Sequence, residues 1–399
     1  MKATTILNRL LTDVTPTMHK VRRQSLKAMI TSLMSGASLS VTSLGRHINS
    51  HTTEKHQIKR STRLCSNLHL QTETAAIYSR VALRLIGEQQ RPVILVDWSD
   101  LDPRKQHFLL RAAVALKGRS LTLLEEIHPL SQKEKPAVHQ RFMQQLKVLL
   151  PDTCQPIIVT DAGFRVPWFK LIESLGWDYV GRVRNRTLCI NKTDSDWHAV
   201  KDLYAGATAK AKALGSYQLC RRNSIACQLH VYKSSHKKRH HLTAQGDTSR
   251  QSANSRANAN REKEPWLLAT SLTGCLAADA KKVTQIYATR MQIEESFRDL
   301  KSGLNLNESN TRNRHRLSIL LLLAMLGQFV LYLLGLAVKV AGKQKHYQAN
   351  SLNTDTILSN QFIGLRAFKD RQLRLKRSDW LAAHLKIQEL IAKPLGIAS

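Results

Sequence analysis

The feature that most restricts how this chain can fold is a long apolar segment at Leu317–Val338. Its 22 residues are mostly apolar, which is enough for a helix to cross a bilayer. Gln328 lies in the middle, two glycines interrupt the segment, and Arg or Lys flanks both ends, so no charge asymmetry would set an orientation in a membrane. We therefore expect a helix buried against a sheet, with a membrane-spanning helix as the alternative.

The overall charge indicates a polyanionic partner. The 399 residues include 61 Lys and Arg against 29 Asp and Glu, a formal net charge of +32. Such a surplus favours nucleic acid first and an anionic membrane surface second. Because 42% of the residues are hydrophobic, the chain can build cores and is not a disordered basic tail. The balance argues against a secreted binder of acidic ligands and against an ordinary metabolic enzyme.

The cysteines and the N-terminus indicate a cytoplasmic location. The six cysteines are scattered without a CxxC pair, which is typical of reduced thiols. The first residues, MKATTILNRLL, contain neither a long apolar stretch nor a small-residue cleavage site, so we expect no export signal.

The first 70 residues have the pattern of short basic helices. Helical periodicity runs over Val21–Met34, Leu39–Ile48 and Glu54–Asn67, with tight breaks between, which suits a helix-turn-helix-like module. In the third helix, basic residues recur every four positions, while another face could point to a core through Ile58, Thr62 and Cys65. The basic residues are Lys55, Lys59 and Arg63. We expect a DNA-binding domain at 1–75; a merely solvated charged helix is the alternative.

The middle of the chain predicts a mixed α/β sheet. Two hairpin-linked strands are expected at Phe108–Leu116 and Ser120–Ile127, and alternating helices and strands follow up to Arg184. Short strands continue from about 186, and Lys233–Glu262 is a low-complexity basic segment expected to be a mobile loop. The last fifty residues are predicted to be helical.

Two aspartates share a position in this pattern. Asp97 and Asp161 each follow a short apolar run, PVILV and IIVT. Strand ends that meet at one edge of an α/β sheet would bring these carboxylates together, and oxygen-only ligation suits Mg²⁺. The alternative for each is an Asp that starts a turn or caps a helix.

A third acid comes from a predicted long helix over Ala277–Lys301. At about 100° per residue, four polar residues share one stripe beside the apolar face of Ile286, Ile293, Phe297 and Leu300. The stripe contains Tyr287, Arg290, Glu294 and Lys301. Glu295 and Asp299 are expected to face solvent. An ordinary amphipathic helix gives the same pattern, so this alternative stays open.

These residues carry a resemblance to a known family. Tyr287-x2-Arg290-x3-Glu294-x6-Lys301 resembles the Tyr-Arg-Glu-Lys signature of bacterial insertion-sequence DDE transposases of the cut-and-paste, hairpin-forming group. LVDWSD around Asp97 and VTDAGF around Asp161 are similar to the two Asp motifs of that family. The resemblance implies a ribonuclease-H-like core at 76–345 with a β-rich insertion at 186–275, and a helical C-terminal region at 346–399.

The resemblance also implies roles. Asp97, Asp161 and Glu294 would be catalytic and hold two Mg²⁺ ions, for which Mn²⁺ can substitute. Tyr287, Arg290 and Lys301 would hold phosphates of the transposon end, and Trp266 would stack on a flipped base. The partners would be double-stranded DNA, as inverted ends and target, and a second subunit in the DNA complex; the location would be the bacterial cytoplasm at the nucleoid, without a membrane partner.

Two other functions fit the same residues. One is a ribonuclease-H-like DNA nuclease that lacks strand transfer. The other is a DNA-binding repressor in which the acids are structural. Charge and helix pattern alone do not separate these three functions.

Overall fold

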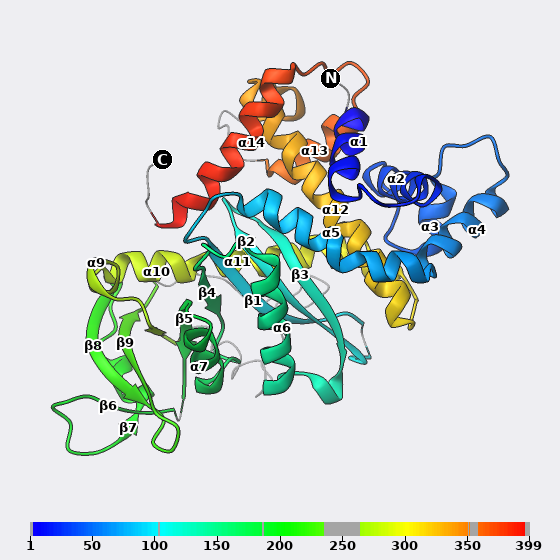
Figure 1. The fold of residues 1–399 in the computed structure, drawn as a ribbon. Helices are drawn as coiled ribbons and strands as arrows, with labels where there is room; N and C mark the ends of the chain where they lie inside the picture. The colour runs from blue at the N-terminus through cyan, green and yellow to red at the C-terminus, as the bar shows by residue number, and fades with distance from the viewer. Residues whose placement is uncertain are drawn as a thin grey trace. The chain divides into compact units, whose positions relative to one another are not determined.

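A computed structural model describes residues 3–102, 104–185, 187–234, 264–349, 351 and 358–395 of the chain. They belong to two units: Met1–Pro156 with Met291–Ser399, and Ile157–Arg290. Each unit is described by itself, and Figure 1 shows the elements of both. Apart from its first two residues, the segment Lys233–Glu262, expected as a mobile loop, lies outside the described residues.

The first unit begins with five helices. Their bounds are α1 Ala3–Val14, α2 Lys20–Met34, α3 Val41–Arg46, α4 Glu54–Cys65 and α5 Leu68–Ile86. The three expected helices correspond to α2, α3 and α4. The helix α3 crosses α4 so closely that a Cβ atom at Gly45 would lie 2.6 Å from the Cα atom of Ile58, so this crossing requires glycine. The N-terminal region is therefore all-helical, as expected.

Three antiparallel strands follow in the first unit. They are β1 Val93–Asp100, β2 His107–Ala115 and β3 Ser120–Pro129, in the order β3-β2-β1, and α6 Pro136–Leu149 comes after them. Gly118, with φ of +76°, provides the left-handed residue in the tight turn between β2 and β3. The predicted hairpin is confirmed.

The second unit contains the rest of the strands. Its parallel pair β4 Ile157–Thr160 and β5 Asp178–Val183 is linked by α7 Val166–Ser174. The strand order is β4-β5-β10-β9-β8-β6-β7, with these further strands: β6 Leu188–Ile190, β7 His198–Ala199, β8 Lys212–Leu219, β9 Ile225–Tyr232 and β10 Trp266–Thr270. A three-stranded meander is followed along the chain by β4, a helix and β5, and then by β6–β10, which is consistent with the expected ribonuclease-H-like core and β-rich insertion.

The predicted single helix over Ala277–Lys301 is wrong. The chain instead forms α9 Gly274–Ala278, α10 Ala280–Ala288 and α11 Met291–Arg298, followed by a π-helical turn at Asp299–Gly303. The Asp279 side chain accepts the Lys282 N–H and starts a new helix. The Thr289 hydroxyl donates to the Ile286 carbonyl at 2.6 Å, a local bond that competes with helix continuation. The second unit ends after α10, and the first resumes with α11.

The apolar segment forms α12 Arg314–Val340, a core helix. It is long and apolar enough to span a membrane, but its most hydrophobic window is completely buried inside the protein. Helices cover most of it, namely α2, α13 Asn360–Lys369 and α14 Arg377–Ala392, and β3 also contacts it (Figure 1). The expectation of burial against a sheet was therefore only partly right, because helices provide most of the packing.

Candidate active site

Asp97 lies inside a strand of the first unit and not at its end. The strand β1 continues through Asp97 to Asp100, so the expectation that Asp97 ends an apolar strand is corrected. Val93–Val96 are fully buried and Asp97 is half-buried, and its Oδ1 accepts the Trp98 N–H at 2.8 Å. The strand extends because β2 pairs with it along its whole polar end, up to Asp100 opposite Phe108.

Trp98, the neighbour of Asp97, is held by a histidine. Its indole N–H donates to Nε2 of His139 on α6 at 3.1 Å. Burial lowers the pKa of His139 to about 4, which keeps the imidazole neutral and able to accept this bond. The strand position next to Asp97 is therefore fixed by a contact with α6.

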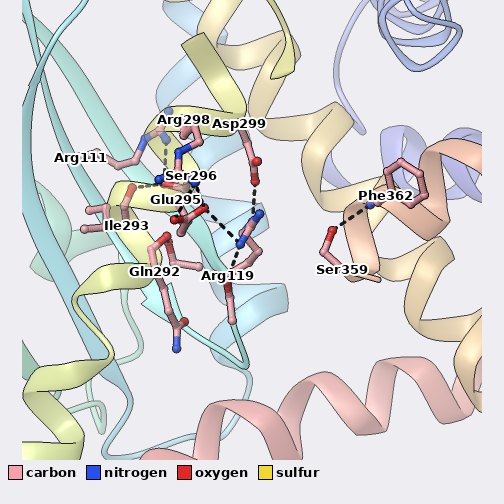
Figure 2. A network of polar contacts seen from close by, with 12 residues as sticks. Arg111, Arg119, Gln292, Ile293, Glu295, Ser296, Arg298, Asp299, Ser359 and Phe362 are labelled. Carbon is pink, nitrogen blue, oxygen red and sulfur yellow. Dashed lines mark hydrogen bonds and ion pairs between the residues drawn. The ribbon is translucent and has the colours of Figure 1, made fainter. Parts of the chain in front are cut away.

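Glu294 lies in the first turn of α11, which packs against β1, β2 and β3. It is half-buried and follows Ile293, which is fully buried, as is Leu300 seven residues later. The buried face of this segment is therefore as predicted. The prediction for Glu295 and Asp299 is wrong: both are half-buried and face Arg119, at 3.6 and 2.7 Å (Figure 2).

Lys301 of the first unit has an acidic partner that the sequence did not indicate. Its Nζ lies 2.9 Å from Oδ1 of Asp100, three residues after Asp97 on β1. The two residues are 201 positions apart, so no local pattern could reveal the pair. The contact brings the end of the Tyr-Arg-Glu-Lys signature to the strand that carries Asp97.

In the second unit, Asp161 directly follows β4 and lines a cavity of about 650 Å³. Its Oδ1 accepts the Gly163 N–H at 2.8 Å, which orders the turn. The cavity lining is cationic as well as acidic because it includes Arg165, Arg182 and Arg184. A carboxylate in an arginine-lined cavity provides ligands for a cation beside donors for phosphate.

Two of the cavity residues, Arg182 and Arg184, were not among the site residues predicted from the sequence. Arg182 lies in β5 and Arg184 directly follows the strand, two residues later, and both line the cavity. Arg182 donates to the carbonyl groups of Glu264 and Pro265 at 3.3 and 3.1 Å, and Arg184 donates to the Glu264 carboxylate at 2.8 Å. Burial lowers the pKa of Arg182. The signal that could have found them is the segment GRVRNR, where arginine recurs every second residue.

Tyr287 is buried in the second unit and contacts Trp266. The two rings meet edge to face with centroids 4.9 Å apart, and the Arg290 guanidinium lies 5.9 Å from the Tyr287 ring. Burial raises the pKa of Tyr287, so its hydroxyl stays neutral. Trp266 is the first residue of β10 and is half-buried. Within this unit the structure therefore groups Tyr287, Arg290 and Trp266, three of the sequence candidates.

The basic residues of α4 lie on one exposed face. Lys55, Lys59 and Arg63 are all exposed, whereas Cys65 is buried and Ile58 and Thr62 are half-buried. A four-residue spacing aligns such side chains along a helix. These three exposed side chains can therefore contact a polyanion together.

The candidate metal ligands are distributed over both units. Asp97 and Glu294 come from packed elements of the first unit, and Asp161 belongs to the second. Within the described ranges, no group of three or more His, Cys, Asp and Glu side chains could hold a metal ion. The donor chemistry nevertheless fits a hard divalent cation, because all three residues offer carboxylate oxygens.

Comparisons with known proteins identify the family. No curated protein sequence matches the chain. A solved structure described as the cryo-EM structure of piggyBac transposase synaptic complex with hairpin DNA is similar at 10% identity and a TM-score of 0.43, covering 100% of this chain and 83% of that one. The family model described as "Transposase DDE domain" matches residues 88–327, more than half of the chain and a range that contains all three acids. Members of this family use divalent metal ions to act on DNA. The chain therefore belongs to the DDE transposase family.

Proposed function

We propose that this protein is a cut-and-paste transposase that binds the inverted ends of a mobile element. It would cleave both strands through a hairpin intermediate and join the freed 3′ ends to target DNA. The observation that carries this proposal is the cavity at Asp161, where one carboxylate shares its surroundings with Arg165, Arg182 and Arg184. Such a cavity suits a phosphodiester that is held by cations and cleaved beside a carboxylate.

Asp97, Asp161 and Glu294 would hold two Mg²⁺ ions, with Mn²⁺ as a substitute. When bound, the ions would supply activation of the attacking oxygen and charge stabilisation at the leaving oxygen. The Trp98 N–H bond to Asp97 and the Gly163 N–H bond to Asp161 each orient one carboxylate. Such orientation reduces the reorganisation needed when ligands gather.

The cationic and aromatic residues would hold the DNA. Arg290 and Lys301 would bind phosphates of the element end, assisted by the Tyr287 hydroxyl. The half-buried Trp266, with Tyr287 against its ring, could stack on a base that leaves the duplex, which would help the strand to bend into a hairpin.

The N-terminal helices would recognise the element end. The exposed row Lys55, Lys59 and Arg63 on α4 supports this role, since such residues fix a helix on the DNA backbone. Two copies of the chain would pair in the DNA complex, one for each end. The protein would act where bacterial DNA lies, in the cytoplasm at the nucleoid.

Incubation with DNA tests the reaction. The substrate is a labelled fragment ending in the short inverted repeat that flanks the gene, incubated with the full-length protein and Mg²⁺. We expect hairpin-ended DNA and joined product on denaturing gels. Linear hydrolysis products with neither hairpin nor joined product would instead establish a nuclease without strand transfer.

Substitution of the three acids tests their assignment. We expect Asp97→Asn, Asp161→Asn and Glu294→Gln each to abolish cleavage while affinity for the end fragment is retained, because each change removes a metal-binding charge without removing a DNA-binding cation. Asp152→Asn, at an exposed acid of the first unit, is the matched control and should cleave normally. Retained cleavage in any of the three variants would refute the metal assignment, and a protein that only binds DNA would be a repressor.

A further inference from the structure

We infer that the β2–β3 hairpin positions Glu294 for metal binding through a polar clamp on α11. The clamp consists of Arg111, the Leu116 main chain and Arg119 on the hairpin, and Gln292, Ser296 and Asp299 on α11 and the turn after it. All these residues belong to the first unit. The inference rests on the proposed function, because it concerns the acid that the proposal assigns to the metal.

The clamp begins with a row of charges across the sheet. Asp97 on β1 pairs with Arg111 on β2, and Arg111 pairs with Glu125 on β3. Directly opposed residues point to the same face of an antiparallel sheet. Asp97 therefore shares its face with Arg111, and Arg111 donates from that face to Ser296 on α11.

Arg111 joins the sheet to α11 at the centre. Its side chain is 1% exposed, bonds the Glu125 carboxylate at 2.7 and 2.9 Å, and donates to the Ser296 hydroxyl at 3.2 Å (Figure 2). Its guanidinium also lies 5.0 Å from the centroid of the Phe297 ring. Tyr78 donates to the other Glu125 oxygen at 2.7 Å. Because this guanidinium is buried and its planar geometry is fixed, its bond to Ser296 keeps α11 from rotating about its own axis.

Two outer contacts fix the ends of the same segment. The Gln292 side chain accepts the Leu116 N–H at 2.8 Å and donates to the Leu116 carbonyl at 2.9 Å, so it bonds the hairpin backbone like a neighbouring strand. At the other end Arg119 bonds Asp299 at 2.7 Å (Figure 2). Glu294 lies between these contacts, two residues after Gln292 and two before Ser296. With both ends and the centre attached, its backbone cannot shift along or around the helix axis without breaking a bond.

The consequence concerns metal affinity. A carboxylate on a loosely held helix must be ordered when the ion binds, and that ordering opposes binding. The clamp instead orders the Glu294 backbone when the chain folds, so that binding of the ion does not have to order it. Gln292, Ser296, Arg111 and Arg119 are therefore positioning residues, which act on the ion through Glu294.

Mn²⁺ binding by the full-length protein without DNA tests the clamp, with electron paramagnetic resonance as the readout. We expect Gln292→Ala with Arg119→Ala to weaken Mn²⁺ binding about 10- to 100-fold. The metal concentration for half-maximal cleavage should rise by a similar factor, saturating metal should restore the rate, and affinity for the end fragment should not change. Arg298→Ala is the matched control, because this exposed arginine on α11 pairs with Glu295 of its own helix, at 3.0 Å.

A second variant removes the centre of the clamp. Arg111→Met combined with Glu125→Gln removes both charges together, so that no buried carboxylate is left without a partner. We expect the same loss of Mn²⁺ affinity. Mn²⁺ binding equal to wild type in either folded variant would overturn the clamp while leaving the metal assignment intact. If wild type and Asp97→Asn bind Mn²⁺ equally, the assigned metal site is wrong and the clamp inference fails with it.

Discussion

Asp100 pairs with Lys301, the residue that we propose to bind a DNA phosphate. Burial acts to raise the pKa of Asp100, but hydrogen bonds and nearby positive charge, chiefly those of Lys301, outweigh it, and the pKa lies below its usual value. The carboxylate is therefore ionised at neutral pH, and under the proposed function it would compete with DNA for the ammonium group. In the proposed reaction, a phosphate must replace Asp100 before Lys301 can hold it.

Asp100→Asn should therefore strengthen DNA binding. An exposed ion pair is worth about 0.2–1 kcal/mol, so we expect a gain in affinity of about 1.4- to fivefold. The slope of log affinity against log salt should steepen by up to about 0.9, since one more cation reaches a phosphate. Fluorescence anisotropy at several salt concentrations measures both.

Two controls make this test specific. Asp102→Asn should have no effect, because Asp102 accepts the N–H groups of Gln106 and His107 within its own loop. In a Lys301→Gln background, Asp100→Asn should give no gain. An equal gain in that background would show that the effect comes from net charge and not from release of Lys301.

Single residues show what the sequence could and could not predict about the site. Asp97 and Asp161 became candidate ligands because they follow short apolar runs, a local signal. Other contacts join residues that are far apart in the sequence. Lys301 and its partner Asp100 are 201 positions apart, and Arg111 and Ser296, to which it donates, are 185 apart. No periodicity contains that information, because it arises only when the chain packs.

Elements were predictable where local pattern and burial agree. The strand at Ile157–Thr160 and the hairpin at β2 and β3 have continuous apolar runs bounded by turns, and the structure has them at those places. The helix over Ala277–Lys301 failed because its apolar period continues through Asp279 and Thr289, while the side chains of these two residues bond the local backbone and divide it. Periodicity records which face is buried, not whether the backbone stays continuous.

The contact between α12 and α13 gives a prediction at the scale of elements. A Cβ atom at Gly335 would lie 1.8 Å from the Asn360 carbonyl oxygen, and one at Gly364 would lie 1.9 Å from that of Leu331. Because backbone atoms cannot move aside as a side-chain end can, Gly335→Ala should lower the free energy of unfolding by about 3 kcal/mol or more. Urea unfolding followed by circular dichroism measures the loss.

Gly327→Ala in the same helix is the matched control. Its Cβ would meet only a Leu33 methyl group, at 3.3 Å, and alanine favours the helix, so we expect a change below about 1 kcal/mol. A comparable loss in both variants would mean that the close approach of α12 and α13 is not the cause.

At the scale of the whole molecule, the charge of +32 opposes folding unless a polyanion or salt screens it. Acid adds to this repulsion, since the chain has 16 histidines. Three of them are held neutral in the fold: burial is the main cause that lowers the pKa of His139, His230 and His384 to about 4. His230 is 1% exposed, and within the described part of the chain neither of its ring nitrogens has a hydrogen-bond partner.

Stability should therefore fall as the pH drops from about 6.5 to 4. Below pH 6.5 the unfolded chain binds protons at these histidines, whereas the folded chain does so only near pH 4, so unfolding takes up protons and acid favours it. Each histidine contributes about 1–3 kcal/mol to the loss. Urea unfolding at pH 7.5, 6 and 5 should show it, and His230→Phe, which removes one titrating group from the core, should flatten the dependence. His51→Gln, at an exposed histidine, should not. A free energy of unfolding that is constant over this range would show that the buried imidazoles accept protons without cost.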